Sequence, residues 1–200
     1  AVVRLSREGL PQFLIDMTWP GINVRPIEDL TGEAHFNEVF FDNLFLPEDS
    51  LIGQLGEGWH QAMAELAYER SGPERFLSTM PLVDLFVRRL AAGPAAAGDV
   101  AAGRLLARLM TLRNMSLCVW GALGTGQSPV IEAAMVKDLG NSFEQALPPA
   151  VQALAEIDPA GAPELAAVLA QLLMVSPSFS LRGGTREILR GIIARGLGLR

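Results

Sequence analysis

The spacing of apolar and polar positions divides the chain into two parts of different character. Up to about residue 50, short apolar runs alternate with turn-forming residues, which is the pattern of β-strands. The expected strands lie at 12–16, 22–25 and 34–41, separated by turns at 19–21 and 31–32. Three or four strands are too few for an independent sheet with a covered face, so we expect them to belong to a larger β domain.

From Gly56 onward the apolar positions follow the period of amphipathic helices rich in alanine and leucine. The expected helices lie at 57–71, 74–91, 100–123, 128–154, 162–174 and 185–196. Pro148-Pro149 is expected to kink or stop the fourth, and the Ala/Gly-rich stretch 91–103 to form a flexible connection. The predicted fold class is α+β: a partial β domain of few antiparallel strands over 1–54, then an all-α up-down helical bundle over 55–200.

Composition limits the classes of function. Half of the 200 residues are apolar and 19% are charged, which describes a folded chain with a sizeable core. A net charge of −6 lacks the basic footprint of a nucleic-acid-binding protein. His35 and His60 have no partners at ligand spacing, so no metal site is expected. The single cysteine, Cys118, lies in an apolar helical segment and is predicted to be a buried structural thiol in a reducing cytoplasm.

Neither a secretory leader nor a membrane span is expected. Arg4, Arg7 and Glu8 interrupt any apolar run at the start of the sequence. The most apolar windows, 104–123 and 160–180, contain arginines or a glutamate with prolines, so neither gives a nearly uncharged span of about 20 residues. The sequence therefore predicts a cytoplasmic protein.

The predicted helix at 57–71 places charged side chains on or beside its apolar face. Projected at about 100° per residue, Arg70 falls in the middle of that face and Glu69 at its border. The apolar members of the face are Trp59, Ala62, Met63, Leu66 and Ala67. A buried guanidinium needs anionic partners or an interface edge. Arg70 could equally extend its charge to solvent from the last turn, and Glu69-Arg70 could be a structural ion pair.

The last predicted helix begins after Arg182-Gly183-Gly184-Thr185. Two glycines allow the backbone to approach another group closely, and Thr185 is a competent N-cap. Amides at such a helix start could bind an anion. A plain Gly-Gly-Thr cap without a ligand explains the same residues.

Two stretches at opposite ends of the bundle resemble one enzyme family. The run Gly53–Arg70, preceded by 36–42 and Leu46-Pro47, is similar to the flavin-dependent acyl-CoA dehydrogenases where the middle β domain passes into the C-terminal helical domain. The ending 183–194 is similar to that family's closing helix. A full member also has an N-terminal helical domain and the first part of the β domain, which are not found in this stretch.

The resemblance implies an oxidoreductase that converts an acyl-CoA to the 2-enoyl-CoA, with a carboxylate removing the α-proton and FAD accepting the β-hydride. The commonest base position, immediately before the Gly-Thr pair, holds Gly183 here rather than an acid. A smaller group places the base before an arginine on the first helix, so the resemblance implies Glu69 as base, with Arg70 setting the local geometry. It also implies that Gly183 and Gly184 bind the thioester carbonyl, and that Thr185 and Glu187 contact FAD.

Departures from the family pattern leave a second hypothesis open. Residues 91–103 stand where an Arg-x-x-Phe-Gly stretch contacts a neighbouring subunit's FAD, and 157–180 lack the expected glycine-rich segment. The chain could therefore be a catalytically silent subunit with a structural role in a hetero-oligomer, or a helical bundle converged on the same motifs. The partners implied are an acyl-CoA, an electron-transfer protein, and further subunits of a homo- or hetero-oligomer.

Overall fold

The computed structural model describes residues 9–92, 98–155 and 161–199. The chain divides into two compact units, Ala1–Glu65 and Leu66–Arg200. The domain boundary predicted after residue 54 stays a prediction.

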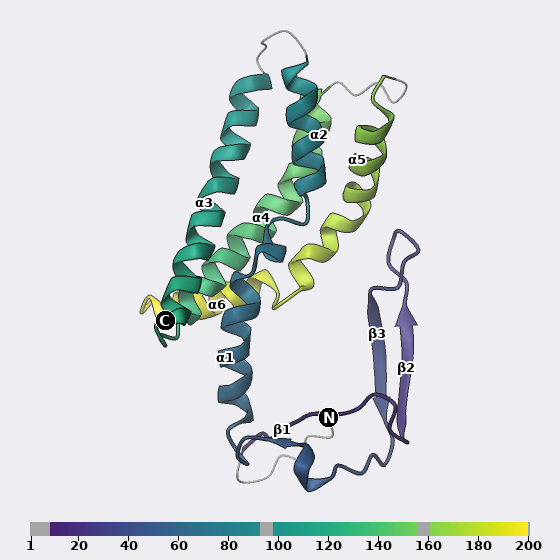
Figure 1. Ribbon diagram of the computed structural model, residues 1–200, viewed down its shortest axis with the longest axis vertical. Helices are drawn as coiled ribbons and strands as arrows, with labels where there is room; N and C mark the ends of the chain where they lie inside the picture. The colour runs from purple at the N-terminus through teal and green to yellow at the C-terminus, as the bar shows by residue number, and fades with distance from the viewer. Residues whose placement is uncertain (1–8, 93–97, 156–160, 200) are drawn as a thin grey trace. The chain divides into compact units, whose positions relative to one another are not determined.

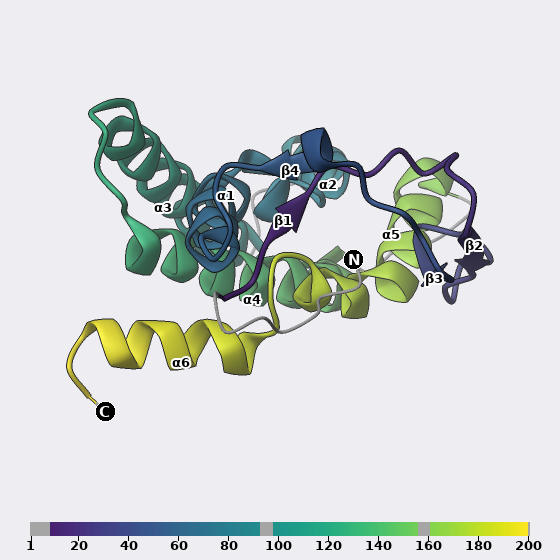
Figure 2. The same ribbon diagram turned by 90° about the horizontal axis from the view of Figure 1, so that it is seen from below.

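The first unit contains two small antiparallel sheets. One joins β1 (Gln12–Phe13), labelled in Figure 1, to β4 (Leu51–Ile52), labelled in Figure 2. The other joins β2 (Ile22–Ile27) to β3 (Phe36–Phe41), as Figure 1 shows. In the second sheet the register runs from the Ile22–Phe41 pair to the Ile27–Phe36 pair. A short 3₁₀ turn, η1 (Glu48–Ser50), precedes β4. The prediction of few antiparallel strands in this part of the chain is confirmed.

The second unit is a helical bundle, entered through the last turns of α1, which begins in the first unit. The helices are α1 (Gly58–Ser71), α2 (Met80–Ala91), α3 (Gly98–Gly124), α4 (Val130–Ala155), α5 (Pro163–Val175) and α6 (Arg186–Gly196). Two 3₁₀ segments, η2 (Pro73–Arg75) and η3 (Ser176–Leu181), precede α2 and α6. Successive helices α2 to α5 run in alternating directions (Figure 1), which confirms the predicted α+β class with an up-down bundle.

Helix α4 is the centre of this bundle, because it contacts α2, α3, α5 and α6. The core consists of apolar side chains that are at most 8% exposed, most of them from α2 to α5, with Ala67 of α1, Phe179 of η3 and Phe76. They include Leu82, Phe86, Leu109, Leu112, Val136, Leu147, Leu165 and Leu169. Helix α6 lies along the first half of α4, as Figure 2 shows from below. Burial of these apolar faces on one another is the main stabilisation of such a bundle.

Two predictions about helix boundaries were wrong, and of the two alternatives for Pro148-Pro149 the structure excludes the stop. The helix expected from residue 74 begins at Met80, because Pro81 fits only the first turn of a helix. Helix α4 continues through Pro148 and Pro149, so these prolines do not stop it. Within the stretch 91–103, residues 98–103 are the start of α3 and not a flexible connection, while 93–97 lie outside the described residues.

Two side chains expected to be buried are exposed. Cys118 is exposed. Helix α3 packs against the bundle through one face only, and its apolar residues also occupy the solvent-facing side, where Cys118 lies. Trp59 is 66% exposed, so the apolar face predicted for α1 is buried only toward its end, at Ala67.

Among the described residues, one segment, Pro163–Leu181, is long and apolar enough by composition to cross a membrane. No membrane span was expected in this part of the sequence. The structure divides it into α5 and η3 at Ser176. Its side chains Leu165, Leu169 and Phe179 are core residues of the bundle.

Candidate active site

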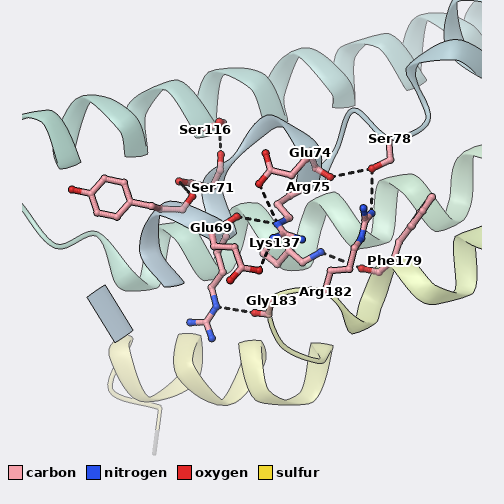
Figure 3. A network of polar contacts seen from close by, with 12 residues as sticks. Glu69, Ser71, Glu74, Arg75, Ser78, Ser116, Lys137, Phe179, Arg182 and Gly183 are labelled. Atoms are coloured by element: carbon pink, nitrogen blue, oxygen red, sulfur yellow. Dashed lines mark hydrogen bonds and ion pairs between the residues drawn. The ribbon is translucent and has the colours of Figure 1, made fainter. Parts of the chain in front are cut away.

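The last turn of α1 and the loop between η3 and α6 bring Glu69 and Gly183 together (Figure 3). Gly183 and Gly184 have φ angles of +72° and +112°, a region that other residues rarely adopt. A Cβ atom at Gly183 would lie 3.1 Å from Glu69 Oε1. Two residues singled out at opposite ends of the bundle are therefore neighbours within the second unit, and glycine leaves room for the carboxylate.

Arg70 connects α1 to the same loop. Its side chain is buried, with the residue 4% exposed, and its Nε donates a hydrogen bond of 2.9 Å to the carbonyl oxygen of Gly183. Burial lowers the pKa of Arg70, and the neighbouring Glu69 carboxylate opposes that effect. The partner that a buried guanidinium requires is thus a backbone carbonyl, and this bond fixes the orientation of the Gly183–Gly184 peptide.

Glu69 is held by Arg75, which the sequence argument did not identify. Arg75 Nε donates to the backbone oxygen of Glu69 at 2.9 Å, and Arg75 Nη2 donates to Glu69 Oε1 at 2.5 Å. Arg75 is 7% exposed, whereas the Glu69 side chain is 40% exposed. The signal for this contact was the Gly72-Pro73 turn, which ends α1 and returns the chain onto its last turn.

Lys137 is a second residue that sequence reasoning missed. It is fully buried on α4, and its Nζ donates to Asn141 Oδ1 at 2.5 Å and to the carbonyl oxygen of Phe179 at 3.1 Å. Burial, with the nearby positive charges of Arg75 and Arg182, lowers the pKa of Lys137 to about 8. Through its hydrogen bond to Phe179, Lys137 connects η3, which precedes Gly183, to the central helix α4.

A buried carboxylate, Glu144, holds the other side of that loop. Glu144 Oε1 accepts the backbone N–H of Ser78 at 2.7 Å, and Glu144 Oε2 accepts Arg182 Nη2 at 3.3 Å. Burial raises the pKa of Glu144, although the Ser78 hydrogen bonds and the charges of Arg182 and Lys137 act in the opposite direction. Arg182 also lies over the Phe179 ring, 4.5 Å from its centroid. These contacts immobilise the residue immediately before Gly183.

Thr185 and Glu187 lie at the start of α6, where solvent reaches both. Thr185 is the N-cap residue, but its hydroxyl makes no capping hydrogen bond to the backbone. The pKa of Glu187 is lowered, first by its own backbone N–H and then by the Thr185 hydroxyl. A reachable hydroxyl and carboxylate fit the hydroxyl groups of FAD, so these positions are compatible with the cofactor contact that the resemblance implies.

We compared the chain with known proteins. No family model matches it. Acyl-CoA dehydrogenase FadE34 of Mycobacterium tuberculosis is 31% identical over 203 residues, which cover 96% of this chain and 27% of that protein. Acyl-CoA dehydrogenase IpdE1 of the same species is 37% identical over 131 residues, covering 62% of this chain and 32% of that protein. The chain thus spans about a third or less of the length of these curated relatives.

A solved structure, the FAD complex of PigA, has the same fold, with a TM-score of 0.78 at 24% identity over 96% of this chain and 53% of that chain. The sequence relatives show that the chain belongs to the acyl-CoA dehydrogenase family. The family resemblance is confirmed, and the expected oxidoreductase class and FAD cofactor agree with these relatives. The roles assigned to Glu69, Arg70, Gly183, Gly184, Thr185 and Glu187 stay predictions.

Proposed function

We propose that the protein containing this chain is an FAD-dependent acyl-CoA dehydrogenase and that Glu69 is its catalytic base. The observation that supports this most strongly is the position of the Glu69 carboxylate beside Gly183. Gly183 stands where many family members have the base, so a carboxylate from α1 reaches the same place without an acid in the loop.

The proposed reaction removes two hydrogens from neighbouring carbons of the acyl chain. Glu69 accepts the α-proton, and the electron pair of that C–H bond forms the new C=C bond as the β-hydrogen leaves with its electrons. When bound, FAD supplies the acceptor for that hydride. The other steps depend on this chain's own residues.

The glycine loop has the role of stabilising the negative charge that develops on the thioester oxygen. We assign the backbone N–H of Gly183, next to that of Gly184, as the donor. Arg70 holds the Gly183 carbonyl at 2.9 Å. This carbonyl shares a peptide plane with the N–H of Gly184, so the Gly184 donor has a fixed orientation before substrate binds. Donors fixed in advance stabilise a developing oxyanion without the cost of reorganisation.

The assignments of substrate, electron acceptor, oligomeric state and location rest on the resemblance to the family. We infer that the substrate is an acyl-CoA, that the reduced flavin is reoxidised by an electron-transfer protein, that the enzyme works as a homo- or hetero-oligomer, and that it is cytoplasmic. Thr185 and Glu187 are the residues of this chain that we assign to FAD.

The test replaces Glu69 with glutamine in the full-length protein. Glu69→Gln keeps the shape of the side chain but cannot accept a proton, so flavin reduction by acyl-CoA should fall at least a hundredfold, on the order expected for loss of a general base. Bound flavin should be retained. The measurement is the bleaching of flavin absorbance across acyl-CoAs of different length and branching.

Glu164→Gln is the matched control, because it makes the same chemical change at an exposed position in the first turn of α5. It should reduce flavin at the normal rate. Unchanged turnover in Glu69→Gln would remove Glu69 from the mechanism, and a flavin-free wild-type protein would favour the silent subunit.

A further inference from the structure

We propose that Arg75 is the positioning residue of Glu69: it binds one carboxylate oxygen and thereby leaves the other to accept the α-proton. This inference rests on the proposed function and adds to it the residue that orients the base.

The first argument is the two-point contact. Arg75 Nε binds the backbone oxygen of Glu69 while Nη2 binds Oε1 of the same residue. A guanidinium is planar, so two bonds from one such group fix the carboxylate relative to its own backbone. A half-exposed glutamate at a helix end would otherwise occupy several rotamers.

The second argument is that the two carboxylate oxygens have different surroundings. Oε1 faces Arg75 and is the oxygen that a Cβ at Gly183 would approach at 3.1 Å. Within the described part of the chain, Oε2 has no hydrogen-bond partner, and the side chain is 40% exposed. The contact to Arg75 therefore occupies the oxygen nearest the loop backbone and leaves Oε2 available.

The third argument is the placement of the other charges around the carboxylate. Arg70 on α1 directs its Nε to the Gly183 carbonyl, and Lys137 on α4 directs its Nζ to Asn141 and Phe179. Arg182 faces Glu144, and Glu74 lies 3.5 Å from Arg75 Nε. Among the described residues, Arg75 is thus the one cation with a hydrogen bond to the Glu69 side chain.

A purely structural Arg75 would act through the backbone contact alone, by securing the end of α1. Loss of the side chain would then lower stability without slowing removal of the α-proton in the protein that remains folded. The two roles can be separated by an assay of proton removal that needs no oxidation.

The experiment uses the full-length, flavin-loaded protein and an acyl-CoA in which sulfur replaces the β-carbon. This analogue can lose its α-proton but has no β-hydrogen to give. Deuterium uptake at its α-carbon from heavy water, followed by mass spectrometry, measures proton removal directly. The kcat and KM for a normal acyl-CoA are measured alongside.

We expect Arg75→Ala to slow deuterium uptake and kcat at least tenfold, with KM changed less than twofold. Added ethylguanidinium should restore part of the uptake by entering the space left by the side chain. Arg75→Lys, which keeps the charge but cannot make both bonds, should be intermediate, and it supplies the test if the alanine variant does not fold.

Arg88→Met is the matched control, because Arg88 is an exposed arginine on α2 whose partner is Asp84, and it should match the wild type. Wild-type uptake rates in Arg75→Lys and in folded Arg75→Ala, with Glu69→Gln inactive, would overturn the role of Arg75 alone. Absence of uptake in the wild type, or normal uptake in Glu69→Gln, would overturn the proposed function and this inference with it.

Discussion

At the scale of single residues, the buried ammonium of Lys137 makes stability depend on pH. Its pKa is lowered from 10.5 to about 8 in the folded chain, chiefly by burial. Below about pH 8 both folded and unfolded chains hold this proton, whereas between about pH 8 and 10.5 only the unfolded chain does. Because the unfolded state then binds more protons, the free energy of unfolding rises as pH increases from about 8 to about 10.5. The same gain in stability is lost when pH falls through this window.

We therefore expect the stability difference between wild type and Lys137→Met to grow in favour of the wild type from about pH 8 to about pH 10.5. The slope can reach about 1.4 kcal/mol per pH unit for a single group. Urea unfolding of both proteins across this range gives the measurement. Parallel curves for the two proteins would show that Lys137 keeps an ordinary proton affinity.

Individual site residues could be predicted only where the sequence supplies a local signal. Glu69 and Arg70 stand out because they interrupt an apolar helix face, and Gly183-Gly184 because a glycine pair precedes a helix. The turn at Gly72-Pro73 is the local signal for Arg75. Lys137 and Glu144 give none, since each is an ordinary charge in an amphipathic segment. Their importance depends on contacts between distant segments, which no local pattern contains.

At the scale of elements, one carboxylate on α4 binds two arginines of α6. Asp138 on α4 accepts Arg186 Nε at 3.4 Å and Arg190 Nε at 3.2 Å, and its side chain is 13% exposed. Asp138→Asn removes the charge that both arginines share. We expect α6 to open more readily, by about 1 kcal/mol, or roughly fivefold faster amide exchange in α6.

Hydrogen exchange followed by mass spectrometry measures this effect segment by segment. Exchange in α3 should stay unchanged. Asp84→Asn is the control, because its partner Arg88 lies on the same exposed face of α2 and such pairs contribute little. Faster exchange throughout the bundle would mean that Asp138 supports the whole domain and not the attachment of α6.

The elements themselves were largely predictable, because glycine and proline mark most helix ends and the apolar period is strong in the bundle. Two of the differences concern proline. Pro81 starts a helix where continuity was expected, and Pro148-Pro149 fails to stop one. Tertiary packing of Leu147 and Val151 on the core decides the second case, since both are almost fully buried on either side of the prolines.

At the scale of the whole molecule, the apolar segment Pro163–Leu181 allows a direct test of where the protein resides. Because Leu165, Leu169 and Phe179 are core residues, we expect the full-length protein not to float with phospholipid vesicles in a density gradient. Flotation that resists high salt would show that α5 leaves the bundle and enters the bilayer.

The meeting of Glu69 with Gly183 also bears on how such proteins are recognised in genomes. A search that demands an acid in the closing loop would discard this chain as inactive. The proposed mechanism requires a carboxylate at one point in space, which either of two distant segments could provide. Function in such sequences is better assigned by superposing candidate acids in three dimensions than by aligning a single column.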